Sequence, residues 1–455
     1  MSAQSANPGP PDRVIPAPSG TRDFYPVELA RRRWIEHRWR KVALRHGFDE
    51  IDGPTFERSD LYAVKSGDGI LGELFQTFSG KDPEQAKLAG EGRAPLALRP
   101  EFTPTLARMY AARAGQLPKP AKWFWQGPCF RAEKPQRGRL REFWQWNCDV
   151  IGGNFTVADA ESAERALLDA EVVGVCVDLL AECGLSADAI KVRLNDRGAA
   201  TRLIASCGGA GQETAALTLL DRRGKMPAVD WAAQFTSLGI DVARYEAAAT
   251  AASLDAPGFA ALGAQLRSSG LEAWCVLDHS IARGLAYYTG MVFEVIVDGE
   301  RAVAGGGRYD NLIELFGGPP TPACGFGMGD VVLSLVLQDK KLMPNDKEIA
   351  RELGLRPDVF VISNGSLESD AALPATLAAL RKAGLHARRS YKATGKIGKL
   401  LKDASDQNAH FAIILEDGGE VSVKDLDQNK QREGRVKLDD LVKAPREFLP
   451  ATGLV

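Results

Sequence analysis

The segments KWFWQGPCFR (residues 122–131) and LREFWQWNCDVIGG (residues 140–153) decide the fold, because their pattern predicts an antiparallel hairpin. Both segments are rich in aromatic residues, which are typical of β-strands. The loop between them, AEKPQRGR, contains proline, glycine and several basic residues. We therefore expect two aromatic strands joined by a basic loop.

The basic loop is the clearest functional signal in the chain. It places five positive side chains around a glycine turn: Arg131, Lys134, Arg137, Arg139 and Arg141. A hairpin tip exposed to solvent would have the same composition. However, Arg131 and Glu133 alternate on one face with Phe143 across the hairpin, so charges and an aromatic ring converge. Arginine suits phosphate oxygens and an aromatic ring suits an adenine face, so this loop favours a nucleotide ligand.

The chain before the hairpin predicts a helix at residues 26–47 and then a strand that Pro54 interrupts. Proline within a strand indicates a sheet edge or an interface. In LRPEFTPTLARM (residues 98–109), Glu101 and Thr103 lie at a strand-to-helix turn. Glu101 either stabilises the start of the helix or accepts a ligand ammonium group.

The chain after the hairpin predicts helices at residues 158–186 and an alanine-rich helical insertion at about 199–266. Strands and turns then return in WCVLDHS, MVFEVIV and RAVAGGGRYD. The segment RGLAYYTG places Arg283 in a glycine turn before Tyr287 and Tyr288, where tyrosines are more often core residues than ligand groups. The first domain is therefore expected to be an antiparallel sheet flanked by helices.

Two glycine-rich segments close this domain. AGGGRYDNL lacks the spacing of a dinucleotide-binding loop and instead indicates a close approach of the backbone to a ligand. CGFGMGDVVLSLVL (residues 324–337) predicts a strand followed by a helix, with Asp330 as the only charge at the helix start. A polar boundary follows, and residues 356–455 alternate strand and helix patterns, which predicts a compact α/β domain.

Composition limits the functional classes. The length of 455 residues predicts two or three domains, and 45% hydrophobic with 25% charged residues is ordinary for a soluble globular protein. A net charge of −2 gives no general attraction to nucleic acid, so a polyanion needs a local basic patch. Seven cysteines without a CxxC pair and five histidines without ligand spacing predict free thiols and no metal centre. Residues 1–19 predict a disordered tail without a signal sequence, so we expect a cytoplasmic protein without a membrane span.

Taken in order, these segments resemble the class II aminoacyl-tRNA synthetases, and most closely the histidyl-tRNA synthetase family. The resemblance covers about residues 20–450 and rests on eight segments: GTRDFYP, GPTFE, LRPEFT, GPCFRAEKPQRGRLREFWQ, VRLNDRG, RGLAYYTG, GGGRYDNL and SVKDL. It implies an α+β fold, with a catalytic core at residues 20–198 and 267–345, the helical insertion at 199–266 and an anticodon-binding α/β domain at 356–455.

The resemblance also implies the residues of the site. Six residues would bind ATP: Arg131, Glu133, Arg139, Phe143, Gly325 and Gly327. Nine would bind histidine: Glu101, Phe102, Thr103, Arg131, Gln145, Asp149, Arg283, Tyr287 and Tyr288. Arg131 and Arg283 would be catalytic, because both would contact the α-phosphate.

The implied reaction is a histidine–tRNA ligation. The histidine carboxylate would attack the α-phosphate of ATP, with charge met by Mg²⁺ and the two arginines, and the adenylate would then acylate tRNA(His). The implied partners are L-histidine, tRNA(His) and a second identical subunit. No protein base is needed, since a carboxylate is already ionised at neutral pH.

The chain departs from the family at two places. Ala286 stands where the family usually has aspartate, and GDVV (residues 329–332) replaces the usual Glu-Arg pair that contributes an arginine for the γ-phosphate. Our hypothesis is that Arg139 or a neighbour in the basic loop carries this phosphate. An inert, histidine-sensing regulatory subunit of ATP phosphoribosyltransferase would also lack the arginine, and other class II synthetases share the C-terminal domain type but would not explain RGLAYYTG.

Overall fold

The computed structural model describes residues 15–66, 72–156, 163–223, 226–251, 253–256, 258–281, 288–297, 302–392 and 394–450. These residues form two compact units. The first unit contains the described residues up to 24 and residues 35–343. The second contains residues 25–34 and the chain from residue 344 onward. The predicted Arg283 and Tyr287, and the departure at Ala286, lie outside the described residues.

The first unit is built on an eight-stranded, mainly antiparallel sheet. In spatial order its strands are β1 (Asp49–Glu50), β5 (Ala121–Phe130), β6 (Glu142–Ile151), β11 (Ala323–Gly329), β10 (Ala302–Arg308), β9 (Met291–Ile296), β7 (Lys191–Asp196) and β8 (Cys275–Leu277). Only the outermost pairs, β1 with β5 and β7 with β8, are parallel. The predicted aromatic hairpin is β5–β6, and the α+β fold class is confirmed.

The segment around Pro54 differs from the single interrupted strand that we predicted. Before the proline, β1 joins the large sheet, and after it β2 (Phe56–Arg58) joins a separate small sheet. That small sheet has the order β2, β4 (Leu96–Leu98) and β3 (Gln76–Thr77). Proline lacks the N–H that a continuous ladder needs, so the chain changes sheets at this point.

Helices flank the two sheets. They are α1 (Pro26–Arg45), α2 (Ser59–Ser66), α3 (Pro83–Gly90), α4 (Thr103–Ala111), α5 (Ala163–Glu182), α11 (Leu312–Leu315) and α12 (Asp330–Asp339). Helix α5 is buried along most of its length because it packs against strands β6, β10 and β11 and against helix α10. In the part of the chain that the structure describes, no helix combines the length and apolar character needed to cross a bilayer.

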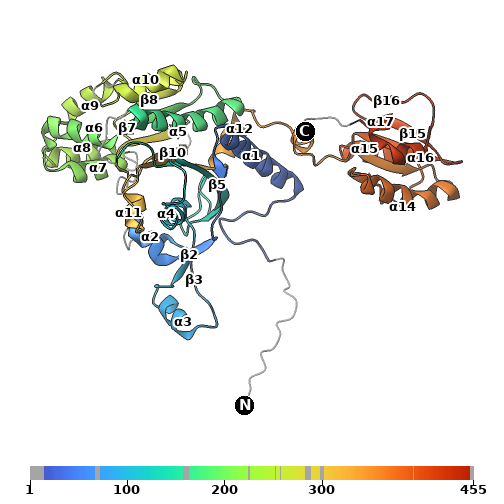
Figure 1. Ribbon diagram of the computed structural model, residues 1–455, viewed down its shortest axis with the longest axis horizontal. Coiled ribbons are helices and arrows are strands. Elements are labelled where there is room, and N and C mark those ends of the chain that lie inside the picture. The colour runs from blue at the N-terminus through green and yellow to red at the C-terminus, as the bar shows by residue number, and fades with distance from the viewer. Residues whose placement is uncertain are drawn as a thin grey trace, which may run out of the picture. The chain divides into compact units, whose positions relative to one another are not determined.

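Within the described residues, the span of the predicted insertion contains five α-helices. They are drawn in green to yellow in Figure 1. They are α6 (Arg197–Ile204), α7 (Glu213–Asp221), α8 (Ala228–Ser237), α9 (Val242–Thr250) and α10 (Ala260–Ser268), with a π-helical turn at Ala205–Gly209. Helices α6 to α9 enclose a core of their own, which includes Trp231, Phe235 and Tyr245. The helices are therefore a small packed body and not a loop.

The second unit is a three-layer α/β structure, drawn in orange and red in Figure 1. Along β12, Val359 and Val361 pack under α14, whereas Phe360 and Ile362 pack under α15, because successive side chains of a strand point to opposite faces. Its strands are β12 (Val359–Ser363), β13 (Ala387–Arg389), β14 (Phe411–Glu416), β15 (Glu420–Asp425), β16 (Lys430–Gln431) and β17 (Val436–Lys437). Its helices are α13 (Asp346–Glu352), α14 (Leu367–Lys382), α15 (Ile397–Asp406), α16 (Leu438–Lys443) and α17 (Pro445–Phe448).

Candidate active site

A cavity of about 660 Å³ opens over the centre of the large sheet. Ten of the residues predicted from the sequence line it: Glu101, Thr103, Arg131, Arg139, Phe143, Gln145, Asp149, Tyr288, Gly325 and Gly327. These residues come from five separate stretches of sequence, so the fold brings together what the sequence keeps apart.

Strand β6 supplies the floor of the cavity because its side chains alternate between two faces. Phe143, Gln145 and Asp149 are two or four residues apart and all line the cavity. The intervening Trp146 points to the other face, where its ring stacks on Trp39 of α1 at 6.0 Å between centroids. The alternation that predicted a strand therefore also decides which side chains reach a ligand.

The glycines of β11 make room for the side chains of β6. Gly325 pairs with Asp149 across the sheet, and a Cβ at Gly325 would overlap the Asp149 carboxylate. A Cβ at Gly327 would likewise overlap the side-chain amide of Gln145. The resemblance implied that Gly325 and Gly327 bind ATP, and in the structure both glycines also leave room for the side chains of two other cavity residues.

We call the part of the cavity formed by Gln145, Asp149 and Tyr309 the buried end, because its polar groups are held by other buried side chains. Asp149 is 1% exposed, and its Oδ1 accepts a hydrogen bond from the Tyr309 hydroxyl at 2.5 Å. The Cys129 thiol donates to Gln145 Oε1 at 3.4 Å. Burial raises the pKa of Cys129 to about 12, so this thiol stays protonated and serves as a donor.

A network of buried ion pairs surrounds Arg308, the residue that precedes Tyr309. Arg308 is 1% exposed and contacts the carboxylates of Asp169 at 2.8 Å and Asp310 at 3.2 Å. Arg165 pairs with the same Asp310 at 3.1 Å. Burial opposes the charge on Arg308, but the nearby carboxylates outweigh it and raise its pKa, so the guanidinium stays charged. Sequence reasoning missed Tyr309, although GGGRYD was recognised as a ligand-approach segment.

We call the part formed by Arg131, Arg139 and Phe143 the basic end. The Arg131 guanidinium lies 5.0 Å from the centroid of the Phe143 ring, and its Nε donates to the Pro100 carbonyl at 3.2 Å. Arg139 forms an ion pair with Glu133 inside the basic loop. Glu133 is not among the residues lining the cavity, because its carboxylate is turned toward Arg139.

Phe102 does not reach the cavity. It is fully buried and its ring stacks on Trp125 at 4.3 Å between centroids and 7° between planes. Among the described residues, it belongs to the hydrophobic core that also holds Leu106 and Tyr110 of α4. Phe102 therefore lies between two residues that line the cavity, Glu101 and Thr103, while its own side chain packs into the core.

The start of α12 brings an apolar wall to the basic end. Gly329, Val331 and Val332 line the cavity there. Asp330 is 2% exposed; its Oδ1 accepts from the Trp144 backbone N–H and its Oδ2 pairs with Arg22. Two further acidic residues line the cavity without any signal in the sequence, namely Glu294 of β9 and Asp221 at the end of α7.

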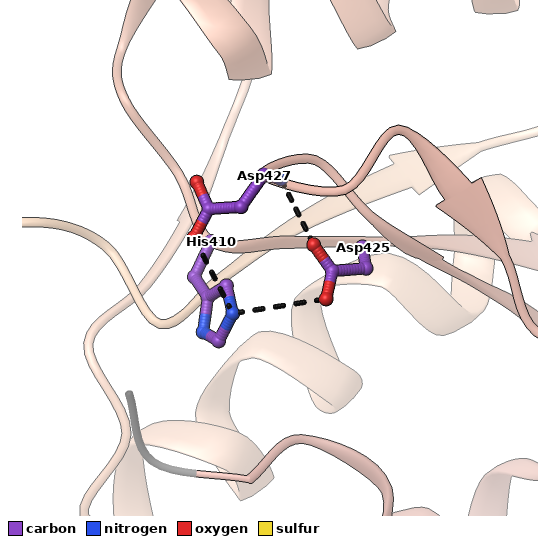
Figure 2. A group of neighbouring side chains, drawn as sticks. All are labelled: His410, Asp425 and Asp427. Carbon is purple, nitrogen blue, oxygen red and sulfur yellow. Dashed lines mark hydrogen bonds and ion pairs between the residues drawn. The ribbon is translucent and has the colours of Figure 1, made fainter. Parts of the chain in front are cut away.

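A group of potential metal ligands lies in the α/β unit. Figure 2 shows His410 beside Asp425 and Asp427, with ligand atoms within 4.8 Å of one another. Arg356 donates to both oxygens of Asp427, at 2.6 and 2.8 Å, and so already supplies a positive charge. Burial and the nearby Arg356 lower the pKa of His410. The group is explained as a charge network, and we assign no metal to it.

Comparisons with known proteins identify the family of the chain. The family model described as "Histidyl-tRNA synthetase" matches residues 20–330. A histidine–tRNA ligase of Haloarcula marismortui is 34% identical over 438 residues, which is 90% of this chain and 94% of the relative.

Solved structures agree on the fold. Apo histidyl-tRNA synthetase of S. aureus superposes with a TM-score of 0.63 at 24% identity, covering 96% of this chain and all of that one. A Bacillus halodurans protein described as an ATP phosphoribosyltransferase regulatory subunit/histidyl-tRNA synthetase has the same TM-score at 20% identity, covering 88% of this chain and 98% of that one.

Proposed function

The chain belongs to the histidyl-tRNA synthetase family, and we propose that it is a histidine–tRNA ligase of the cytoplasm that activates histidine with ATP and charges tRNA(His). The observation that carries the proposal is the division of one cavity into a rigid acidic pocket and an arginine-bearing end with an aromatic ring. A small zwitterion with a polar ring fits the first, and a nucleotide fits the second.

The buried end has the groups needed to select histidine. Asp149 offers a carboxylate to an imidazole N–H, and the Tyr309 hydroxyl fixes its orientation. Tyr288 lines the same pocket, and Glu101 is the acid suited to the ligand ammonium. A ligand without the ring N–H would leave buried polar groups unpaired, which is how such sites reject close analogues.

The basic end has the groups needed for attack on ATP. Arg131 lines this end, and its fork would bind the α-phosphate and the amino-acid carboxylate together. Phe143, beneath that guanidinium, offers a flat face to adenine. The reaction then needs alignment and charge stabilisation but no covalent intermediate with the protein. The second proposed catalytic arginine, Arg283, lies outside the described residues.

The residues of the cavity also suit Mg²⁺. This ion is bound through nucleotide phosphates and one or two carboxylates, and the carboxylates of Glu101, Asp221 and Glu294 line the cavity in addition to that of Asp149. When bound, Mg²⁺ would neutralise part of the phosphate charge. The chain's own arginines would then orient the α-phosphate toward the histidine carboxylate.

The α/β unit offers a surface for tRNA. Tyr391 is 82% exposed, and the Arg389 guanidinium lies 4.8 Å from its ring centroid. Basic residues continue along this stretch: Arg388, Lys392, Lys396, Lys399 and Lys402. An exposed aromatic ring among positive charges suits unpaired bases and phosphates, so we assign the anticodon contact to residues 388–402.

We propose that the chain forms a homodimer through a surface at the small sheet. Phe56 of β2 is 55% exposed and Phe78, which follows β3, is 42% exposed. Large apolar side chains on one short sheet are typical of a surface that another subunit covers. We therefore place the dimer contact near this sheet.

One observation favours a second function. The first turn of α12 has no basic residue, so the γ-phosphate lacks the usual arginine there. A regulatory subunit that binds histidine without activating it would tolerate this loss. The arginines of the basic loop favour the enzyme, since a pure histidine sensor has no use for a second, positively charged end of the cavity.

The test is histidine-dependent exchange of pyrophosphate into ATP by the purified protein. We expect exchange with histidine and with no other amino acid, and a loss of at least about 100-fold in Arg131→Ala, since that arginine would meet the charge of the transition state. Tight histidine binding without exchange would establish the regulatory function instead.

A further inference from the structure

The N-terminal strap, which we define as residues 19–24, is fixed to the base of the basic loop. The Gly20 carbonyl accepts hydrogen bonds from the backbone N–H groups of Arg141 at 2.8 Å and Glu142 at 3.3 Å. Gly20 has a φ of +83°, and a Cβ there would crowd the side chains of Pro135 and Arg141. Both the conformation and the contact therefore require glycine at this position.

From this anchor, Arg22 reaches the start of α12. Its Nη2 contacts Asp330 Oδ2 at 2.7 Å, and the Asp330 side chain is 3% exposed. The other oxygen of Asp330 accepts the Trp144 N–H at 2.8 Å. The ring of Phe24 packs edge-on against Trp144, with 6.4 Å between centroids and 80° between planes. One buried carboxylate thus joins the strap, strand β6 and helix α12.

The residues beside these contacts form two walls of the basic end. Phe143 precedes Trp144 in β6, and Val331 and Val332 follow Asp330 in α12. The spacing between the aromatic floor and the valine wall is therefore set through Asp330. A buried carboxylate is costly unless a cation compensates it, and Arg22 supplies that charge.

We propose that Arg22 is a positioning residue for nucleotide binding, acting through Asp330 to hold the first turn of α12 at a fixed distance from Phe143. The proposal rests on the proposed function for the identity of the nucleotide as ATP. The buried end is held by different contacts, from Tyr309 to Asp149 and from Cys129 to Gln145. Loss of Arg22 should therefore weaken the binding of ATP and leave the binding of histidine unchanged.

The experiment measures the Kd of each ligand separately by calorimetry, and the KM of each in the exchange reaction. We expect Arg22→Met to raise the Kd and the KM for ATP about tenfold or more, because the substitution removes the cation that compensates a buried carboxylate. The Kd and the KM for histidine should rise less than about twofold, because that carboxylate supports only the basic end. The double variant Arg22→Met/Asp330→Asn should return ATP binding to within about threefold of the wild type, because the amide still accepts the Trp144 N–H without a charge to compensate.

Asp339→Asn is the matched control. Asp339 ends the same helix, and its pair with Arg137 at 2.9 Å is exposed, with side-chain exposures of 58% and 62%. We expect this substitution to change neither constant, because exposed ion pairs contribute little.

Three results would overturn the proposal: unchanged ATP binding in Arg22→Met, equal weakening of ATP and histidine, or a double variant no better than the single one. If Arg22→Met does not fold, the double variant and Arg22→Lys provide the same comparison. If the wild type binds ATP but shows no histidine-dependent exchange, the proposed function fails, whereas the ATP-specific effect of Arg22 still supports the positioning role.

Discussion

At the buried end of the cavity Asp149 and Gln145 are each held by a buried neighbour, whereas at the basic end Arg139 pairs with another charged side chain of the same loop. Asp149 is fixed by Tyr309, and Gln145 by Cys129. Arg139 instead pairs with Glu133 six residues away, and both are partly exposed, at 40% and 23%.

The difference teaches how one cavity can serve two kinds of ligand. A small rigid ligand is best selected by groups that do not move, because any misfit then leaves buried polar atoms unpaired. A flexible, highly charged ligand must displace ion pairs that the loop makes with itself, so its site gains from side chains that can exchange partners. We therefore expect substitutions at the buried end to cost more than the loss of Arg139, whose side chain pairs within the basic loop.

The largest effect should come from Gly325→Ala. The added Cβ would overlap the Asp149 carboxylate, so strand or side chain must move. We expect histidine-dependent exchange to fall at least about 100-fold, since displacements near 1 Å have that cost. Gly329→Ala is the comparison in the same strand, because a Cβ there meets nothing within 4 Å, and it should change the KM for histidine less than about threefold. If the two substitutions affected the use of histidine equally, the result would contradict a rigid buried end.

A smaller effect is expected from Tyr309→Phe. The ring remains packed, but the Asp149 oxygen loses its donor within a buried pocket. We expect the KM for histidine to rise about tenfold, which corresponds to a typical cost of one unmade buried hydrogen bond. The KM for ATP should stay within about twofold, because Tyr309 is held by contacts independent of the basic loop. A change only in the KM for ATP would contradict the assignment of the buried end to histidine.

The smallest effect is expected from Arg139→Ala. The variant loses a cation for the outer phosphates, but it also releases Glu133 from its ion pair. We expect the KM for ATP to rise only about three- to fivefold, with kcat nearly unchanged, since the pair is partly exposed. The difference in the KM for ATP between the variant and the wild type should be smaller in high salt, because salt screens exposed charges. A loss as large as that of Gly325→Ala would show that the basic end is as rigid as the buried one.

Much of the fold could be predicted because the chain marks its strands and turns by composition. The aromatic segments that form β5 and β6, and the glycine turn between them, are sufficient to indicate the hairpin. The order of the remaining strands could not be read in this way, since β11 pairs with β6 across more than 170 residues of sequence. The change of sheets at Pro54 was likewise missed, because proline marks an interruption without showing where the chain goes next.

Some residues that line the cavity could be predicted from the sequence and others could not, for a physical reason. Charged loops are visible in a sequence, so Arg131 and Arg139 were found. Tyr309, Glu294 and Asp221 were not, because a single tyrosine or acid has the same appearance in a core, on a surface or in a cavity. The glycines of β11 were noticed, but their purpose became clear only when Gly325 was placed opposite Asp149.

These glycines also have a genetic consequence. Gly306, Gly325 and Gly327 lie where a Cβ would overlap backbone or side chains of neighbouring strands. Every missense change of a glycine codon introduces a Cβ, so no single-nucleotide substitution of an amino acid at these positions is conservative. We expect the codons of Gly306 and Gly325 to accept only synonymous changes in a saturation library selected for growth, whereas the Gly327 codon should be more tolerant because the flexible side chain of Gln145 can move aside.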